Sequence, residues 1–500
     1  MSPVGRNVVA NFAGQLWSAL MGVLFIPVYI HLLGLEAFGL VGFFVTLQAL
    51  SVVFDLGLAG TINRELARRG SVEPQSTRDL VRTLEWTYWL LGIAVALLVW
   101  TCSGLLATYW LQPVEFDRTR ASTALGLMGA TLGAQWPSAF YAAGLNGLQR
   151  QVLSNILTAL FGTLRGAGVL IPLLVLDPTI EVFFTWHAAI AAIQSFTCAV
   201  VFWSVLPAGT RRARFSVFEV ARIGRFTSGL SAIALLSFVL AYADRIVLSR
   251  QVPLDQFGVY VIASSVAAAL LRFVQPWFNA FYPRFSEMQA RNDWAALCTA
   301  YHVASQWLAA TVLPVAVVVA VFAEDLLRLW TRDPILSIAA SPILTLLVCG
   351  TAANGLMHLP YALQLAYGWT RLALLTNIVS VLLVVPIAWW LAKAFGAVGV
   401  AAIWPVLNLA YVSFVLPLMH RRIMRGELAS WYVSDVGPSL VASVGVALLL
   451  RTLFPSLPDG LAGLAGIAGI YVAVAMAAIA ATRRPREFAR ASVVGLFARA

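Results

Sequence analysis

Long apolar runs separated by short polar stretches make up most of this chain. A helix that crosses a lipid bilayer needs about 20 mostly apolar residues. Runs of that kind lie at 9–33, 38–60, 86–108, 121–147, 152–176, 182–206, 226–249, 258–282, 299–323, 336–363, 372–394, 397–419, 436–454 and 461–481. The connections between them are too short to fold as separate soluble domains. The pattern predicts an all-α, polytopic membrane protein with about fourteen transmembrane helices.

Composition supports the membrane prediction and excludes several other classes. Hydrophobic residues make up 60% of the chain and charged residues 11%, whereas soluble proteins carry about 25% charged residues. A soluble enzyme, a disordered protein and a nucleic-acid binder are therefore poor interpretations, despite a net charge of +11. The first apolar run is too long for a signal peptide, so we expect its helix to stay in the mature protein.

The basic residues indicate how the chain is oriented. If the N-terminus is cytoplasmic, 23 of the 33 basic residues fall in cytoplasmic segments and 6 on the other side. Arg68, Arg212 and Arg421 belong to the first group, and Arg118 and Lys393 to the second. Cytoplasmic loops of membrane proteins carry an excess of Lys and Arg. We therefore expect both termini to be cytoplasmic.

A short motif recurs at equivalent positions in two halves of the chain. Glu36-Ala37-Phe38-Gly39-Leu40 precedes the second run, and Asp255-Gln256-Phe257-Gly258-Val259 precedes the eighth. An even helix offset predicts a parallel repeat about an axis along the membrane normal. The expected organisation is an N-lobe at 1–206, a cytoplasmic linker at 207–225, a C-lobe at 226–420, two further helices within 436–481 and a basic cytoplasmic tail at 482–500.

Polar residues form stripes along one face of several predicted helices. Polar groups are costly in hydrocarbon and usually face protein or water. The stripes comprise Asn7, Asn11, Gln15 and Ser18; Gln48, Ser51 and Asp55; Asn155, Thr158 and Arg165; Ser265, Arg272, Gln275, Asn279 and Tyr282; and Thr351, Asn354, His358 and Tyr361. Hydrogen bonding between helices explains such stripes without any substrate. A polar cavity between two lobes is the simplest common explanation, because helices that carry stripes also belong to the repeat.

Two arginines lie deep within apolar runs. Arg165 is close to the middle of its run and Arg272 lies in the inner half of its own. An arginine there is costly unless it is solvated or paired. Asp55 and Asp244 could pair with them in structural ion pairs. Alternatively, the arginines line a cationic cavity for an anionic substrate, because the planar guanidinium binds phosphate oxygens in pairs.

The sequence contains no recognisable catalytic or cofactor motif. A glycine-rich phosphate loop, a nucleophile elbow and a zinc motif are all missing, and the four cysteines have no metal-ligand spacing. We therefore expect no catalytic residues, no metal and no cofactor, and no transport powered by ATP bound to this chain. The protein is predicted not to be an enzyme.

Several short motifs resemble one family of membrane transporters. They are Ile26-Pro27-Val28-Tyr29, Gly34 to Gly39, Asp55-Leu56-Gly57-Leu58, Asn63 to Ala67, Gly147 to Gln151, Asp244 to Leu248, and Phe257-Gly258-Val259-Tyr260. In these the chain resembles the polysaccharide-transporter flippases of the multidrug/oligosaccharidyl-lipid/polysaccharide exporter superfamily. The resemblance implies two six-helix lobes around a central cavity. It also implies that a polyprenyl-diphosphate-linked oligosaccharide crosses the inner membrane by alternating access, for lipopolysaccharide or other surface polysaccharide.

The resemblance also implies where substrate would bind. Arg272, with Arg6 and Arg64 at the inner ends of the first two helices, falls where basic cavity residues are expected. The polar stripes add Asn11, Gln15, Gln275 and Asn279 to the candidate cavity, and the cost of a buried charge adds Arg165, which has no family motif around it. A polysaccharide polymerase and glycosyltransferases are the expected protein partners. Two alternatives remain: an ion-coupled drug/cation antiporter of the same superfamily, and a membrane-embedded polysaccharide polymerase, ligase or glycosyltransferase.

Overall fold

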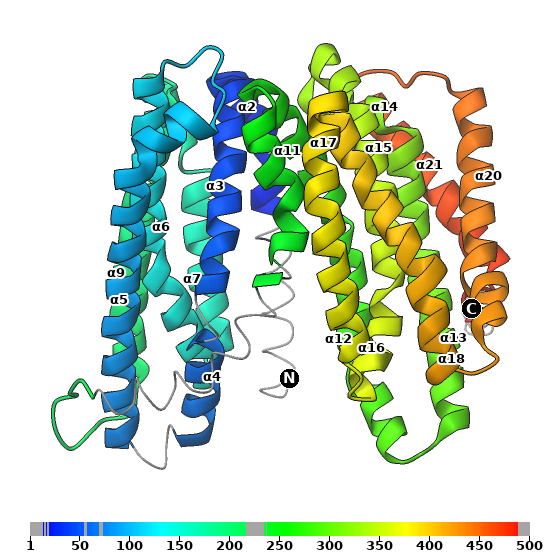
Figure 1. Cartoon of the computed structure of the whole chain (residues 1–500), viewed down its shortest axis with the longest axis horizontal. Coiled ribbons are helices and arrows are strands. Elements are labelled where there is room, and N and C mark those ends of the chain that lie inside the picture. The colour runs from blue at the N-terminus through cyan, green and yellow to red at the C-terminus, as the bar shows by residue number, and fades with distance from the viewer. Residues whose placement is uncertain are drawn as a thin grey trace, which may run out of the picture. The chain divides into compact units, whose positions relative to one another are not determined.

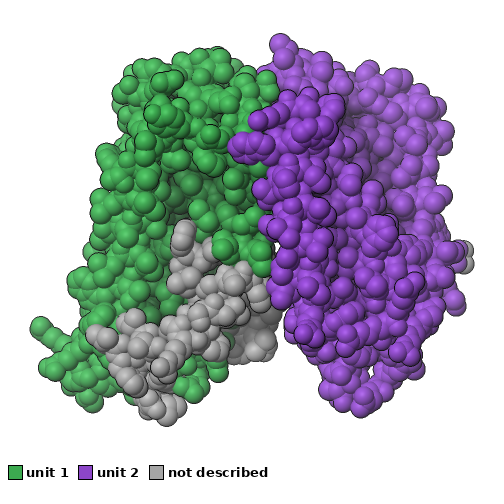
Figure 2. All heavy atoms as spheres, viewed as in Figure 1, with its two compact units in different colours: residues 1–258 green, residues 259–500 purple. Residues whose placement is uncertain are grey.

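The computed structural model describes residues 14, 17, 20–54, 58–69, 74–216, 235–236 and 238–488. Every regular element within these ranges is a helix, which confirms the predicted all-α class. The described part contains nine helices that are long and apolar enough to cross a membrane. The chain divides into two compact units, Met1–Gly258 and Val259–Ala500, which Figure 2 shows in different colours.

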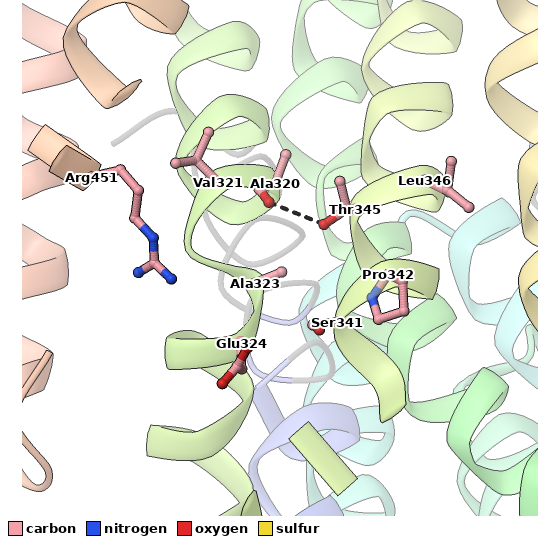
Figure 3. Close-up of a pocket in the computed structure, with 9 residues that line it drawn as sticks. All are labelled: Ala320, Val321, Ala323, Glu324, Ser341, Pro342, Thr345, Leu346 and Arg451. Carbon is pink, nitrogen blue, oxygen red and sulfur yellow. Dashed lines mark hydrogen bonds between the residues drawn. The ribbon is translucent and has the colours of Figure 1, made fainter. Parts of the chain in front are cut away.

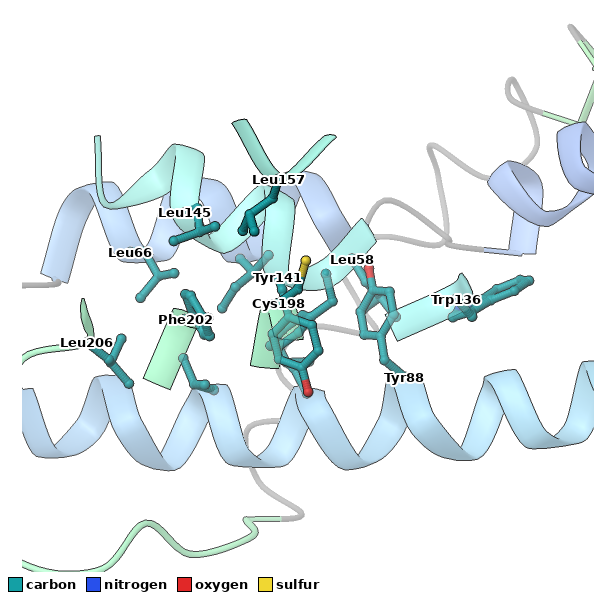
Figure 4. Packing of buried hydrophobic residues seen from close by; sticks show 14 of the residues in the cluster. Leu58, Leu66, Tyr88, Trp136, Tyr141, Leu145, Leu157, Cys198, Phe202 and Leu206 are labelled. Atoms are coloured by element: carbon teal, nitrogen blue, oxygen red, sulfur yellow. The ribbon is translucent and has the colours of Figure 1, made fainter. Parts of the chain in front are cut away.

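In the first unit a long helix lies at the centre of the packing. The elements in chain order are α2 (Ile26–Leu33), α3 (Leu35–Phe54), α4 (Leu58–Arg69), α5 (Pro74–Leu105), the π-helix η1 (Leu106–Trp110), α6 (Arg118–Gly147), α7 (Gln151–Gly166), α8 (Leu170–Val175) and α9 (Ile180–Val205). Helix α6 packs against α4, α5 and α9. A buried aromatic cluster that includes Tyr88, Tyr141 and Phe202 fills the space between these helices (Figure 4).

The second unit is built around α13. It contains α12 (Leu271–Ala290), α13 (Trp294–Val321), α14 (Ala323–Thr331), α15 (Pro334–Leu356), α16 (His358–Ala366), α17 (Arg371–Ala410), η2 (Tyr411–Val415), α18 (Leu416–Arg422), α19 (Leu428–Ser430), η3 (Trp431–Val436), α20 (Gly437–Leu453) and α21 (Leu461–Ala481). Helix α11 (Leu254–Ala269) crosses the boundary between the units. Helix α13 packs against α12, α15, α20 and α21, and the long helices of the unit run side by side (Figure 1).

Several predicted runs are interrupted helices rather than single ones. The run at 152–176 divides into α7 and α8, and the run at 336–363 divides into α15 and α16. The run at 258–282 begins earlier and ends later, as α11 and α12. Apolar composition does not encode these breaks, because neighbouring helices can satisfy the freed backbone groups. The break predicted between 394 and 397 is present at Gly396, whose φ of 59° suits glycine.

The recurring Phe-Gly motif has a structural reason within the first unit. A Cβ atom on Gly39 would lie 2.3 Å from the carbonyl oxygen of Leu254, and one on Gly258 would lie 2.5 Å from that of Leu35. Each glycine therefore lies against the backbone just before the other copy of the motif, where any side chain would clash. The two copies pack on each other reciprocally.

Candidate functional site: the polar face of α12

The structure describes only part of the predicted substrate site. Arg6, Asn11, Gln15 and Asp55 lie outside the described residues. Arg64 is exposed on α4, and Asp244 is half-buried in the helical segment 238–251. The predicted cavity wall formed by the first two helices therefore stays a prediction. The described residues that carry a candidate site belong to α12 and α7.

Helix α12 presents an open polar face. Arg272, Gln275 and Asn279 are spaced by three and four residues, which places them on one side of the helix, and all three are exposed. The Gln275 side-chain amide donates a hydrogen bond of 3.2 Å to Asn279 Oδ1. No acidic side chain among the described residues lies within ion-pairing distance of Arg272. The face thus combines one cation with two amides.

Two prolines add backbone acceptors to this face. Pro276 and Pro283 lie inside α12, four residues after Arg272 and Asn279. Proline has no N–H, so the backbone carbonyls of Arg272 and Asn279 do not receive the usual helical hydrogen bond. In a membrane such carbonyls need another donor, from water, protein or ligand. The α12 face therefore offers hydrogen-bond donors and acceptors within about two helical turns.

Aromatic contacts hold α12 on two other sides. Phe278 stacks on Tyr282 and on Tyr361 of α16, with ring centroids 5.8 and 6.3 Å apart. Trp277 stacks on Trp307 of α13 at 6.4 Å. These packed rings fix the rotation of α12. The Arg272–Asn279 face is thereby left uncovered by α13 and α16.

Arg165 occupies a different setting, at the end of α7. The backbone carbonyls on either side of Arg165 already accept hydrogen bonds from side chains. Trp186 donates to the Leu164 carbonyl at 2.8 Å, and Tyr29 donates to the Gly166 carbonyl at 2.6 Å. Arg165 itself is half-buried, and its Nε donates to the Phe161 carbonyl at 3.4 Å. A cation is stabilised by the partial negative charge at a helix C-terminus. This supplies a structural reason for Arg165 that does not apply to Arg272.

Other stripe residues form hydrogen bonds between helices. Gln48 on α3 donates to Gln135 on α6 at 3.0 Å. Asn354 on α15 donates to Asn408 on α17 at 2.8 Å. The Trp404 indole donates to Thr351 at 3.1 Å. For these positions the structure bears out the interhelical interpretation of the stripes.

Sequence reasoning missed the buried carboxylates. Glu85 accepts hydrogen bonds from Tyr141 at 2.7 Å and Trp203 at 2.8 Å, and pairs with Arg82 at 2.6 Å. Asp325 pairs with Arg328 and Arg451. Both acids lie within two residues of the edge of a predicted run. A search for polar stripes inside the runs therefore passed over them, although Glu85 lies three residues after Arg82, the spacing of a helical ion pair.

A cavity of about 460 Å³ lies beside the Asp325 ion pairs in the second unit (Figure 3). Glu324, Ser341, Thr345 and Arg451 contribute its polar groups. Arg451 is already engaged by Asp325, and Glu324 brings a negative charge to the same wall. The cavity is therefore less suited to an anion than the polar face of α12.

Comparison with known proteins identifies the family. The model of a family described as "Polysaccharide biosynthesis protein" matches residues 4–289, which is more than half of the chain. The chain belongs to the polysaccharide biosynthesis protein family. This membership confirms the resemblance seen in the sequence motifs. A second model, MatE, matches residues 229–390.

One curated relative and two solved structures are similar to this chain over most of its length. A Shigella flexneri protein described as "Putative O-antigen transporter" is 20% identical over 413 residues, covering 80% of this chain and 94% of that protein. The lipid II flippase MurJ in an inward closed conformation superposes with a TM-score of 0.74 at 12% identity, covering 95% and 98% of the two chains. An inward-facing MATE multidrug transporter gives 0.61 at 15% identity, covering 84% and 94%. The fold is thus shared with flippases and drug transporters.

Proposed function

We propose that this protein is a flippase that moves a polyprenyl-diphosphate-linked oligosaccharide across the cytoplasmic membrane by alternating access, for cell-surface polysaccharide biosynthesis. The family match over residues 4–289 carries the proposal. Two proteins support it by their descriptions, which read "Putative O-antigen transporter" for the Shigella flexneri relative and "Lipid II flippase" for the structural neighbour. In this proposal both termini are cytoplasmic, and glycosyltransferases and a polymerase supply and consume the substrate.

The chemistry of the substrate explains why the α12 face is suitable. A diphosphate carries negative charge that must pass the low-dielectric centre of the bilayer. The Arg272 guanidinium replaces part of the hydration that the phosphates lose, and its planar fork binds two oxygens at once. Gln275, Asn279 and the two carbonyls freed by proline pair with sugar hydroxyls. The prenyl tail remains in the hydrocarbon outside the protein.

Substitution of Arg272 tests this role. In a strain whose chromosomal copy is deleted, Arg272→Ala is expected to abolish export of the surface polysaccharide and leave lipid-linked oligosaccharide in the inner leaflet, with normal protein abundance. Arg272→Lys is expected to restore export only in part, since an ammonium keeps the charge but loses the fork. Surface polysaccharide and lipid-linked intermediates are measured by gel and mass spectrometry.

Arg291 provides the matched control for this experiment. It lies just beyond α12 and pairs with Glu287 at 2.8 Å, with both side chains mostly exposed. Arg291→Ala is expected to export normally. Full export by a normally abundant Arg272→Ala protein would remove Arg272 from the mechanism, and Arg165 would then be tested in the same way.

A drug/cation antiporter is the second candidate function. The MatE match and the MATE structural neighbour favour it. Antiporters of organic cations are expected to bind their substrate at unpaired carboxylates, whereas the open charge on α12 is a guanidinium. The deletion strain distinguishes the two functions. Lost polysaccharide with unchanged drug sensitivity supports a flippase, and the reverse result supports an antiporter.

A further inference from the structure

His302 lies between two carboxylates in the second unit. Its Nδ1 atom is 2.5 Å from Asp435 Oδ2 and its Nε2 atom is 3.1 Å from Glu427 Oε2. His302 lies on α13, Asp435 in η3 and Glu427 in the turn between α18 and α19. One imidazole thus joins α13 to two neighbouring segments that lie 125 and 133 residues further along the chain.

The three side chains have further hydrogen-bond partners and differ in their burial. The Asp435 side chain is 1% exposed, and its other oxygen accepts a hydrogen bond of 2.9 Å from the Gln306 side-chain amide. The Gln306 oxygen in turn accepts the backbone N–H of Arg484 at 3.0 Å. Glu427 is different, because 36% of its side chain is exposed. The cluster therefore has a buried end and an end that reaches solvent.

The two contacts require an additional proton. A ring nitrogen and a carboxylate oxygen attract each other at these distances only when a hydrogen lies between them. Neutral histidine supplies one such hydrogen, so two contacts need a second. Whether histidine or a carboxyl group holds that proton, the three groups together carry one negative charge instead of two.

We propose that His302, Asp435 and Glu427 form a proton-binding site that fastens the segment Gly426–Val436 to α13. When the proton leaves, neutral His302 keeps its N–H for buried Asp435, and its other nitrogen presents a lone pair to the Glu427 carboxylate. The Glu427 side chain then rotates away from His302 and into the solvent. The site lies in the chain beside Arg421, Arg422, Arg425, Arg483 and Arg484, the residues predicted to be cytoplasmic, so it responds to cytoplasmic pH.

Neighbouring titratable groups do not substitute for His302. Cys298 and Tyr301 lie on α13, His420 on α18, Tyr432 in η3 and Tyr367 after α16, and the tail brings Arg484 and Glu487. The Tyr301 and His420 rings pack against each other with their centroids 5.7 Å apart. The Tyr432 hydroxyl donates a hydrogen bond of 2.6 Å to the Val412 carbonyl. Among the described residues His302 is the group that contacts both carboxylates.

Glu427→Gln separates this proposal from a purely structural role. A glutamine amide donates its own hydrogen to neutral His302, so both contacts persist without the extra proton. Hydrogen exchange of the full chain in detergent, corrected for the intrinsic pH dependence of exchange, measures protection of Gly426–Val436 between pH 5.5 and 8.5. We expect the wild-type segment to lose protection by roughly three- to tenfold as pH rises, the factor for one hydrogen bond.

The variants are expected to divide clearly. Glu427→Gln should remain protected across this pH range, and His302→Gln should be unprotected throughout. Glu287→Gln, the same change in an exposed ion pair of α12, should titrate like the wild type. Protection of the wild type that does not vary with pH, or a Glu427→Gln or His302→Gln protein that titrates like the wild type, would overturn the proposal. The experiment requires no substrate, so its outcome is independent of the proposed flippase activity.

Discussion

Glu36 and Glu85 are buried carboxylates in which each oxygen accepts at least one hydrogen bond. Glu36, which is 3% exposed, accepts the backbone N–H groups of Val114 and Glu115 at 2.6 and 2.7 Å. Glu85, at 6% exposed, accepts from Tyr141 and Trp203 and pairs with Arg82. A buried charge is tolerated when its lone pairs are satisfied in this way. We therefore expect these residues to contribute to the stability of the fold.

Removal of Glu85 tests this assignment. Glu85→Ala leaves the Tyr141 hydroxyl and the Trp203 indole without their acceptor, and an unsatisfied buried donor costs about 1–3 kcal/mol. Arg82, whose side chain is 40% exposed, can turn to water instead. Glu85→Gln keeps an acceptor oxygen and should cost less. Glu287→Ala, in an exposed pair, should cost about 0–1 kcal/mol. Thermal unfolding of the purified proteins in detergent measures the order, and equal midpoints for Glu85→Ala and Glu287→Ala would contradict it.

At this scale the sequence reveals residue types that are costly in an apolar run, but it does not reveal the partners of those residues. An arginine inside an apolar run is conspicuous, so Arg165 and Arg272 could be selected from the sequence. Their different settings could not, because the helix end at Gly166 and the open face of α12 depend on packing. Glu85, Asp325 and Asp435 lie at the edges of runs, where acids are common, and their role comes from partners more than 50 residues away in sequence, such as Tyr141 and Trp203 for Glu85.

At the scale of elements, the helix starts of α3 and α11 depend on each other. Gly39 and Gly258 each leave room for the carbonyl of the first residue of the other helix. The short repeat in the sequence indicated equivalent positions, but it gave no sign that these positions meet. The two helix starts can pack closely because each has a glycine, Gly39 or Gly258, at the same position of the motif.

A double-mutant cycle measures this mutual dependence. Gly39→Ala and Gly258→Ala each place a methyl group against a carbonyl oxygen, and such overpacking typically costs about 1–3 kcal/mol. The double variant should cost less than the two single costs combined, because the first substitution already separates the turns. Gly445→Ala on α20, where a Cβ meets nothing within 4 Å, should be close to neutral. Strict additivity in thermal unfolding would show that the turns are independent.

At the scale of the whole molecule, the sequence predicted class and family well. Apolar runs are a physical requirement of the bilayer, so most of the described helices could be placed to within several residues. The polar ends of helices could not be placed from apolar runs: α5 begins at Pro74, well before its run at 86–108, and α12 ends at Ala290, beyond its run at 258–282. The count of runs and the arginine asymmetry support one orientation. The cavity itself could not be verified, because Arg6, Asn11, Gln15 and Asp55 lie outside the described residues.

The orientation is open to direct measurement. Arg118 at the start of α6 and Arg212 after α9 are both exposed, and they are predicted to lie on opposite sides of the membrane. In a variant without the four native cysteines, Arg118→Cys should react with a membrane-impermeant thiol reagent in intact spheroplasts. Arg212→Cys should react only after the membrane is opened. Labelling of both from the same side would contradict the predicted topology.

Helix α6 has a consequence for how the protein is made. It is 30 residues long, yet it is not among the nine helices whose composition alone suits a membrane crossing. Its glycine, serine and threonine residues are largely buried against α4, α5 and α9. A helix of this kind gains little from lipid and much from protein neighbours. During synthesis α6 therefore depends on packing against α5, which precedes it. Part of its polar surface is not buried against protein until α9 emerges from the ribosome. The membrane position of α6 is therefore secured by α9, a segment that is synthesised later.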